Sequence, residues 1–98
     1  MKFTETQADK TLTVAIEGRI DTETVGELAE LSYKFDEIRE LIFDFSKVEY
    51  ISSYGLRILL DFQKIMSAEK KVMRILNPNK MVMQVFEMTG FNKILTIE

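Results

Sequence analysis

The sequence predicts a small α/β domain with a mostly parallel central sheet that begins with an N-terminal β-hairpin. Residues 11–17 alternate apolar and polar side chains, as a strand with one buried face does. After them, segments with helical apolar spacing alternate with short β-prone runs, which is typical of parallel strands joined by crossover helices. The 98 residues suffice for one core. We therefore expect a single domain over residues 1–98, with three or more helices and the element order ββαβαβαβ.

The first part of the chain is predicted to form the hairpin and one helix. Strands at residues 2–6 and 11–17 flank a tight turn, and Gly18 ends the second strand. Asp21 lies where a helix should begin, because an acceptor side chain there caps free backbone amides. Four apolar residues at helical spacing predict this helix, namely Val25, Leu28, Leu31 and Phe35. We expect the helix to end near Lys34.

The middle of the chain is predicted to form a buried strand and a central helix. Residues 41–45 show no polar alternation until Asp44, as a strand covered on both faces does, and a polar loop follows them. The next helix runs to about Met66. One line of the helix carries Leu56, Leu59, Leu60 and Gln63, and another carries Ile58, Phe62 and Ile65. The apolar face is therefore wide, and we expect the helix to pack centrally against the sheet.

The C-terminal part is predicted to form a strand, a helix and a closing strand. The strands cover residues 72–76 and 94–97, and the helix runs from about residue 80 to 88 before a glycine C-cap at Gly90. Three methionines lie on or beside this helix: Met81, Met83 and Met88. Methionine fills core gaps and also suits adaptable binding surfaces, so packing and partner contact both remain open for them.

The composition excludes several classes of site. The chain has no cysteine and no histidine, which rules out disulfides, thiolate nucleophiles and histidine bases, and we expect no metal and no cofactor. A net charge of −3 argues against a nucleic-acid partner. The N-terminus lacks the apolar core of a secretory signal, and the apolar runs are too short to insert into a membrane. We therefore expect a cytoplasmic protein that is not an enzyme and is monomeric on its own.

Residues 44–60 carry most of the functional information. A strand ends there, two adjacent serines follow, and a glycine lies in the first turn of the next helix. Ser52 or Ser53 can cap the helix by accepting a hydrogen bond from a free backbone amide. The same amides and the helix dipole favour a phosphate on either hydroxyl, so capping and phosphorylation are compatible. Gly55 lets another surface approach the helix start closely.

Three short motifs together resemble the STAS domain family, which includes anti-sigma factor antagonists and regulatory domains of lipid and anion transporters. Residues 52–56, SSYGL, are similar to the family's Asp-Ser-Ser/Thr-Gly-Leu helix start. Residues 17–21, EGRID, are similar to its Gly-Glu-Leu-Asp turn, and residues 86–91, FEMTGF, to its Leu-x-x-Thr-Gly-Leu ending of the last helix. The motifs follow in the family's order and spacing over essentially the whole chain. The resemblance therefore implies the small STAS fold.

The resemblance implies a non-enzymatic protein-interaction switch. An anti-sigma factor antagonist binds a kinase-type anti-sigma factor and so releases a sigma factor, and the kinase phosphorylates a serine or threonine of the helix-start motif. Aligned on Gly55, Ser53 falls on a position that part of the family phosphorylates. Tyr54 falls on the other hydroxyl position, and Ser52 falls where many members carry aspartate. The resemblance thus implies Ser53 as the phosphoacceptor, then Ser52, then Tyr54.

The resemblance also implies where the partner binds. Antagonists place an aspartate close to the acceptor serine, and Asp21 is at the matching position, where it can also cap the first helix. Tyrosine and arginine are frequent interface hot spots, and both follow the serines. We therefore expect a partner-binding face made of Asp21, Ser52, Ser53, Tyr54, Gly55 and Arg57.

Two other functions remain open. A regulatory STAS subunit of a lipid ABC transport complex would dock the same helix start on an ATPase without phosphorylation. Ser52 and Tyr54 depart from the family's pattern on both sides of Ser53, and this departure keeps that alternative open. An enzyme or small-ligand binder would have to use Asp44 and Glu49 as a carboxylate pair, but the sequence supplies no nucleophile, metal ligand or phosphate loop beside them.

Overall fold

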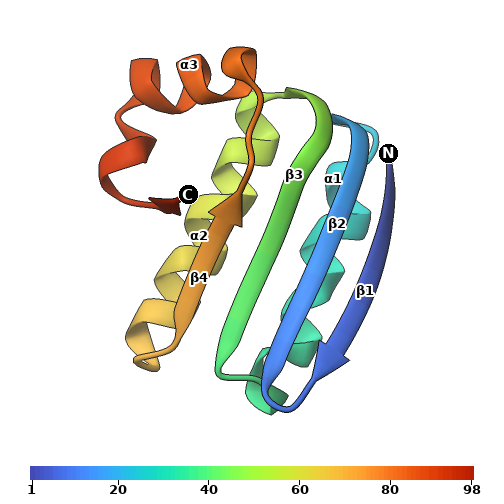
Figure 1. Cartoon of the computed structure of the whole chain (residues 1–98), viewed down its shortest axis with the longest axis vertical. Helices are drawn as coiled ribbons and strands as arrows, with labels where there is room; N and C mark the ends of the chain where they lie inside the picture. The colour runs from blue at the N-terminus through green and yellow to red at the C-terminus, as the bar shows by residue number, and fades with distance from the viewer.

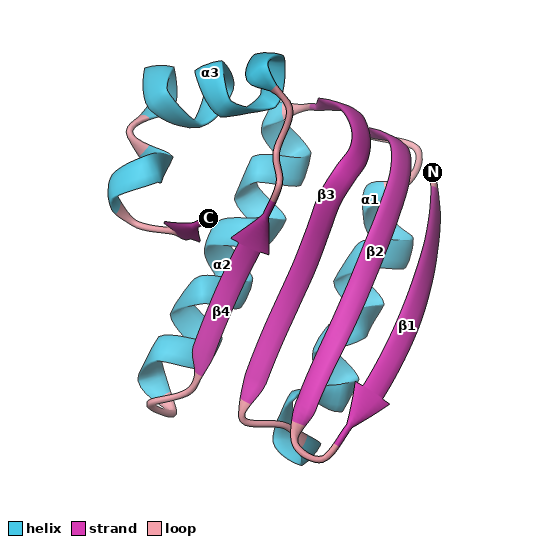
Figure 2. Cartoon of the chain, viewed as in Figure 1, coloured by secondary structure: helices cyan, strands magenta, loops and turns pink.

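A computed structural model describes residues 1–98 and shows a five-stranded sheet with helices packed behind it (Figures 1 and 2). The strands lie in the sheet in chain order: β1 (Lys2–Ala8), β2 (Thr11–Ile20), β3 (Glu40–Ile51), β4 (Val72–Leu76) and β5 (Thr96–Ile97). β1 and β2 are antiparallel, and each later pair of neighbours is parallel. The predicted mostly parallel sheet with an N-terminal hairpin is confirmed.

The helices fill the crossovers between the parallel strands. They are α1 (Val25–Ala29), which continues as the 3-10 helix η1 (Glu30–Glu37), then α2 (Ser53–Ala68), α3 (Lys80–Thr89) and the 3-10 helix η2 (Phe91–Lys93). α1 and α2 lie side by side behind the sheet, and α3 lies across the end at which β3 finishes (Figure 1). No helix has both the length and the apolarity needed to cross a membrane.

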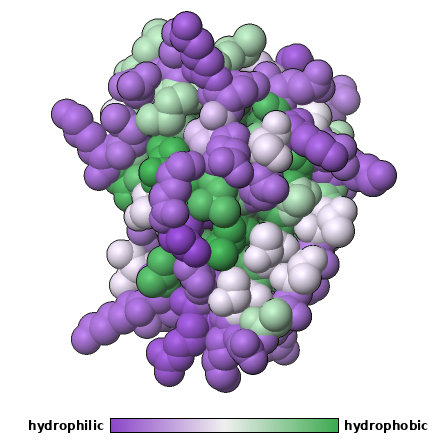
Figure 3. Space-filling model, viewed as in Figure 1, coloured by the Kyte–Doolittle hydropathy of each residue, from purple (hydrophilic) through white to green (hydrophobic).

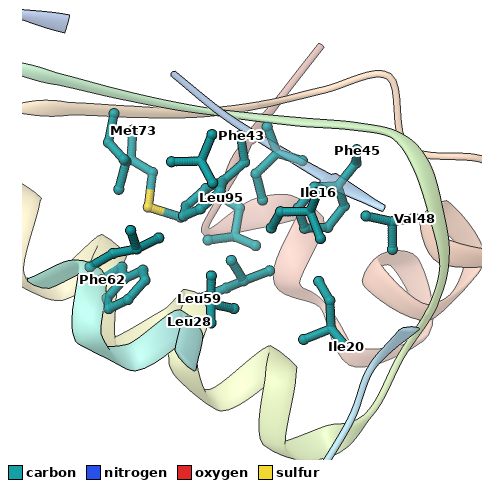
Figure 4. Close-up of a cluster of buried hydrophobic side chains, with 14 of the residues drawn as sticks. Ile16, Ile20, Leu28, Phe43, Phe45, Val48, Leu59, Phe62, Met73 and Leu95 are labelled. Atoms are coloured by element: carbon teal, nitrogen blue, oxygen red, sulfur yellow. The ribbon is translucent and has the colours of Figure 1, made fainter. Parts of the chain in front are cut away.

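One continuous core lies between the sheet and the helices (Figure 4). It contains 22 buried hydrophobic residues and no buried polar side chain. Phe62 on α2 meets Phe35 on η1 edge to face, with ring centroids 4.9 Å apart, and stacks on Phe43 of β3 at 6.2 Å. These aromatic pairs add to the area burial that holds the helices on the sheet.

The opposite face of the sheet carries no helix, so the prediction that residues 41–45 are covered on both faces is wrong. Ile42 and Asp44 are only half-buried on this open face, which Figure 3 shows with apolar atoms in its middle and hydrophilic side chains around them. Ile42 has Thr13 and Arg74 as its register neighbours. The Arg74 guanidinium donates a hydrogen bond to the Glu98 carboxylate and forms an ion pair with Glu40. These contacts raise the pKa of Arg74 above its ordinary value.

β2 and β3 both extend beyond their predicted ends. Gly18 has φ +92° and lies within β2, which continues to Ile20. β3 continues through residues 46–51, where we predicted a polar loop, and it carries one extra residue opposite each of two points on β2. Each bulge shifts the side-chain alternation by one residue. As a result, the buried side chains of this half of β3 are three residues apart: Phe45, Val48 and Ile51.

The remaining elements differ from the prediction mainly at their ends. The first helix begins at Val25 rather than beside Asp21, because residues 21–24 form a turn in which the Val25 amide donates to the Asp21 carbonyl at 2.9 Å. β4 has its predicted bounds, and α3 ends one residue later than predicted, with Gly90 in the left-handed conformation at its C-cap. The closing strand begins at Thr96 rather than at residue 94, because the amides of Ile94 and Leu95 still donate to the carbonyl of Phe91 in η2.

The three methionines of the last helix differ in burial. Met83 packs against the core beside Val82 and Phe86, which are fully buried. Met81 and Met88 point outward and are 57% and 86% exposed. Gap filling therefore accounts for Met83 alone.

Candidate functional site

The ends of β2 and β3 bring two of the sequence motifs together. Ile20 and Ile51 are register partners at these ends, and both are buried. The amide of Ser52 then donates to the carbonyl of Ile20 at 2.8 Å. Asp21, which follows β2, therefore lies at the same edge of the sheet as the start of α2.

The start of α2 assigns different roles to its two serines. Ser52 is the N-cap, with an extended backbone, and its hydroxyl accepts a hydrogen bond from the Gly55 amide at 3.2 Å. Ser53 lies in the first helical turn, is exposed, and its hydroxyl makes no hydrogen bond within the chain. Of the two possible caps, Ser52 is the one that satisfies a free amide, and Ser53 faces solvent.

Gly55 is buried beneath the same helix start. A Cβ at this position would lie 2.8 Å from Ile20 Cγ2 and 2.8 Å from Ile51 Cγ1. Real Cβ atoms do not come so close to a neighbour, so only glycine lets α2 rest on the ends of β2 and β3. The surface that approaches Gly55 closely is therefore the chain's own sheet.

The next outward residues of α2 present an aromatic ring and a cation. Tyr54 is 59% exposed. Arg57 is also exposed, and its Nε donates to Asp61 Oδ1 at 3.3 Å, one turn further along the helix. An exposed pair of this kind adds little stability, so its charges remain available to a docking surface.

Asp21 orders the turn before α1. Its Oδ1 accepts hydrogen bonds from the Glu23 amide at 3.1 Å and from the Thr24 hydroxyl at 3.2 Å. Thr24 holds the N-cap position of α1 but makes no side-chain cap bond there. The prediction that Asp21 caps the first helix is therefore wrong in detail: its carboxylate stabilises the preceding turn, and it does so beside the α2 start.

Two residues of this region, Arg19 and Tyr50, were not singled out from the sequence. The guanidinium carbon of Arg19 lies 4.3 Å from the centroid of the Tyr50 ring, and its Nε lies 3.8 Å from Asp21 Oδ2. The second bulge of β3 makes Arg19 and Tyr50 register partners. Each lies two residues before a motif residue, Asp21 or Ser52, and this was the one signal in the sequence that could have found them.

The two carboxylates considered for an enzyme, Asp44 and Glu49, do not line a common depression. Asp44 Oδ1 accepts a hydrogen bond from the Ser46 amide at 3.0 Å. It borders a shallow depression of about 190 Å³ on the open face of the sheet, whose lining does not include Glu49. No group of three or more acidic side chains is placed to hold a metal ion.

Comparison with known proteins agrees with this arrangement. The family model of the STAS domain matches residues 2–98. BtrV of Bordetella bronchiseptica, provisionally named an anti-sigma factor antagonist, is 29% identical over 99 residues, which cover 99% of this chain and 85% of BtrV.

Solved structures show the same fold. The anti-sigma factor antagonist SpoIIAA in its unphosphorylated form has a TM-score of 0.85 at 19% identity, covering 99% of this chain and 88% of SpoIIAA. The Bacillus cell fate determinant SpoIIAA in its phosphorylated form has a TM-score of 0.80 at 18% identity, covering 99% and 91%. The sheet, hairpin and helices described above thus form a SpoIIAA-like fold.

Proposed function

Because the chain belongs to the STAS domain family, we propose that it acts as an anti-sigma factor antagonist. In this switch the chain binds a kinase-type anti-sigma factor in the cytoplasm and thereby releases a sigma factor. The partner reverses the state by phosphorylating Ser53. The chain itself catalyses no reaction. It provides a surface that binds the partner when Ser53 is unmodified and binds it more weakly when Ser53 is phosphorylated.

The observation that carries the proposal is the division of roles between the two serines. The Ser52 hydroxyl is engaged by the Gly55 amide, whereas the Ser53 hydroxyl is exposed and unbonded. A kinase can therefore reach Ser53 without opening the helix. A phosphate there would meet free amides of the first turn and the positive end of the α2 dipole, so the fold can tolerate it.

The proposed partner-binding face surrounds this hydroxyl. It consists of Asp21, Ser52, Ser53, Tyr54 and Arg57, with Gly55 seating the face from beneath. A partner that covers the face must remove Ser53 from water. When Ser53 carries a phosphate of about −1.5 to −2 charges, that desolvation becomes costly and binding weakens.

Phosphorylation is tested by incubating the purified chain with ATP and the kinase-type anti-sigma factor encoded in the same genome. We expect mass spectrometry to find one phosphate, on Ser53. Ser53→Ala should remain unmodified, and Ser52→Ala should still be modified at Ser53. A phosphate on Ser52 or Tyr54 would contradict the assignment of the acceptor.

Binding is tested by titrating the anti-sigma factor with charge-mimicking variants. We expect Ser53→Asp to weaken binding at least about tenfold, or about 1.4 kcal/mol, and Ser53→Ala to preserve it. The matched control is Ser67→Asp, an exposed serine on the same helix, about 20 Å from Ser53 along its axis. Equal binding by all variants would contradict control of the anti-sigma factor complex by a charge on Ser53. Failure of the wild-type chain to bind the anti-sigma factor would favour the regulatory subunit of a lipid ABC transport complex, which docks without phosphorylation.

A further inference from the structure

We propose that Arg19, held on the ring of Tyr50, is a second anchor of the partner-binding face and pairs with an acidic side chain of the partner. This inference rests on the proposed function, because it concerns the same face. It names the chemistry that the partner must present beside the start of α2.

The pair lies at the border of that face because of the β3 bulge. Arg19 and Tyr50 are register partners, one residue before the buried pair Ile20 and Ile51. Neighbouring residues of a strand point to opposite sides, so Arg19 and Tyr50 point away from the core. The bond from the Ser52 amide to the Ile20 carbonyl fixes this strand end to the start of α2.

The guanidinium of Arg19 is positioned but has no hydrogen bond within the chain. Its carbon lies 4.3 Å from the Tyr50 centroid, and its Nε is 3.8 Å from Asp21 Oδ2, beyond hydrogen-bond distance. The Arg19 side chain is 60% exposed. A planar fork that already lies on a ring loses little freedom on binding, and its N–H groups match a carboxylate in a bidentate pair.

The other cations near the face are placed differently. Arg57 pairs with Asp61 at 3.3 Å and Lys47 on β3 pairs with Glu17 at 3.8 Å, much as Arg19 pairs with Asp21 at 3.8 Å, but neither Arg57 nor Lys47 lies on an aromatic ring. Arg19 is the cation that combines free donors with aromatic support. An acidic partner residue also fits the proposed switch, because a phosphate on Ser53 would repel that residue and compete with it for the cation.

The test measures the Kd of the full chain for two probes, the kinase-type anti-sigma factor and the transporter ATPase subunit of the same genome. For the probe that binds, we expect Arg19→Glu to weaken binding at least about tenfold. Arg19→Lys keeps the charge but loses the planar fork, so we expect a loss of about threefold. Lys47→Glu, the same charge reversal on a side chain that is 72% exposed, is the matched control and should stay within about twofold.

A double-variant cycle separates recognition from a structural role. Tyr50→Leu alone should weaken binding about threefold, because the guanidinium loses its support. In the Arg19→Glu background the same change should cost nothing further. Thermal melts verify that each variant is folded. If Arg19→Glu weakens binding no more than Lys47→Glu, the inference is overturned.

The two probes also separate this inference from the proposed function. Binding to the anti-sigma factor that is insensitive to Arg19→Glu would overturn the role of Arg19 and leave the antagonist function standing. Binding to the ATPase subunit that is sensitive to Arg19→Glu would support Arg19 and overturn the antagonist function. Binding of the wild-type chain to neither probe would overturn both.

Discussion

The starts of α2 and α3 invite comparison, because both helices leave the same end of the sheet through an extended N-cap residue. At α2, Ser52 accepts a hydrogen bond from the amide three residues on, at 3.2 Å. At α3, Asn79 accepts one from Val82 at 2.8 Å and also donates to the Val48 carbonyl at 2.9 Å. The α3 cap side chain is therefore tied to the bulged half of β3, whereas the α2 cap residue is tied to β2 only through its backbone amide, which donates to the Ile20 carbonyl.

The comparison shows two ways to hold a helix start. α3 is held by a polar side chain that reaches the sheet, whereas α2 is held by the backbone amide of Ser52 and by shape, because Gly55 fits against Ile20 and Ile51. Because the Gly55 contact lies between α2 and the sheet, the outward side chains of the helix start are not needed to hold the helix in place. Ser53 and Tyr54 are therefore free to serve recognition, and the same freedom would be lost at a start tied like that of α3.

The largest effect should come from filling the space beneath α2. Gly55→Ala places a Cβ 2.8 Å from two isoleucine side chains, and such overpacking should lower the free energy of unfolding by about 2 kcal/mol in urea denaturation. Gly26→Ala in α1 is the matched control, since its Cβ would meet nothing within 4 Å. It should stabilise the protein by about 0.5–1 kcal/mol. If Gly55→Ala also stabilised the protein, as Gly26→Ala is expected to do, the close fit of Gly55 against the sheet would not be what holds α2.

An effect of similar size should come from removing the Asn79 hydrogen bonds at the start of α3. Asn79→Ala removes both the cap and the donor to the Val48 carbonyl, so we expect a loss of about 2 kcal/mol, about 1 from each. Asn79→Asp keeps the accepting oxygen but not the donor, and should lose about half as much in the same denaturation experiment. Equal losses for the two variants would mean that the cap contributes nothing.

A smaller effect should distinguish the two serines. Ser52→Ala removes the N-cap of α2 and should cost about 1 kcal/mol, whereas Ser53→Ala should cost less than about 0.5 kcal/mol. The two thermal midpoints, measured side by side, check this order. A reversed order would return the cap to Ser53 and would remove the free hydroxyl on which the proposed function depends.

The smallest effect should come from charge at the first helical position. Ser53→Asp places a carboxylate at the positive end of the α2 dipole and should stabilise the fold by about 0.5 kcal/mol at low salt. Lys80→Gln, at the equivalent position of α3, removes a cation from the same environment and should also stabilise. Both gains should shrink in 1 M salt, as measured by thermal melts. Destabilisation by Ser53→Asp would indicate that the fold resists a charge there.

The sequence predicted best where the local side-chain period is unbroken. β4 and α3 each follow one period throughout, and their predicted bounds lie within one residue of those observed. The alternating part of β2 also follows one period, and its predicted start is correct. The second half of β3 was missed because its buried residues are three apart, a spacing that breaks the strand period of two. Only the pairing with β2 reveals the bulges that produce this spacing.

The candidate site was predictable in place but not in its contacts. The motif located the start of α2, yet the choice between Ser52 and Ser53 as the cap depends on which residue takes the extended backbone. The contact of Arg19 with Tyr50 joins two strand ends that are distant in the sequence, and it exists because a bulge brings them into register. Neither the choice of cap nor this contact can be predicted from the residue types of a single segment.

Because the five strands lie in the sheet in chain order, the sheet can grow from one edge as the chain is synthesised. Each strand finds its partner in the strand just completed, so each step closes only the one turn or helical crossover that joins the two neighbours. The hydroxyl-bearing start of α2 rests on the ends of β2 and β3, so its contacts can form without β4 and β5. β5 joins last through two residue pairs, and we expect its amide hydrogens to exchange with solvent first.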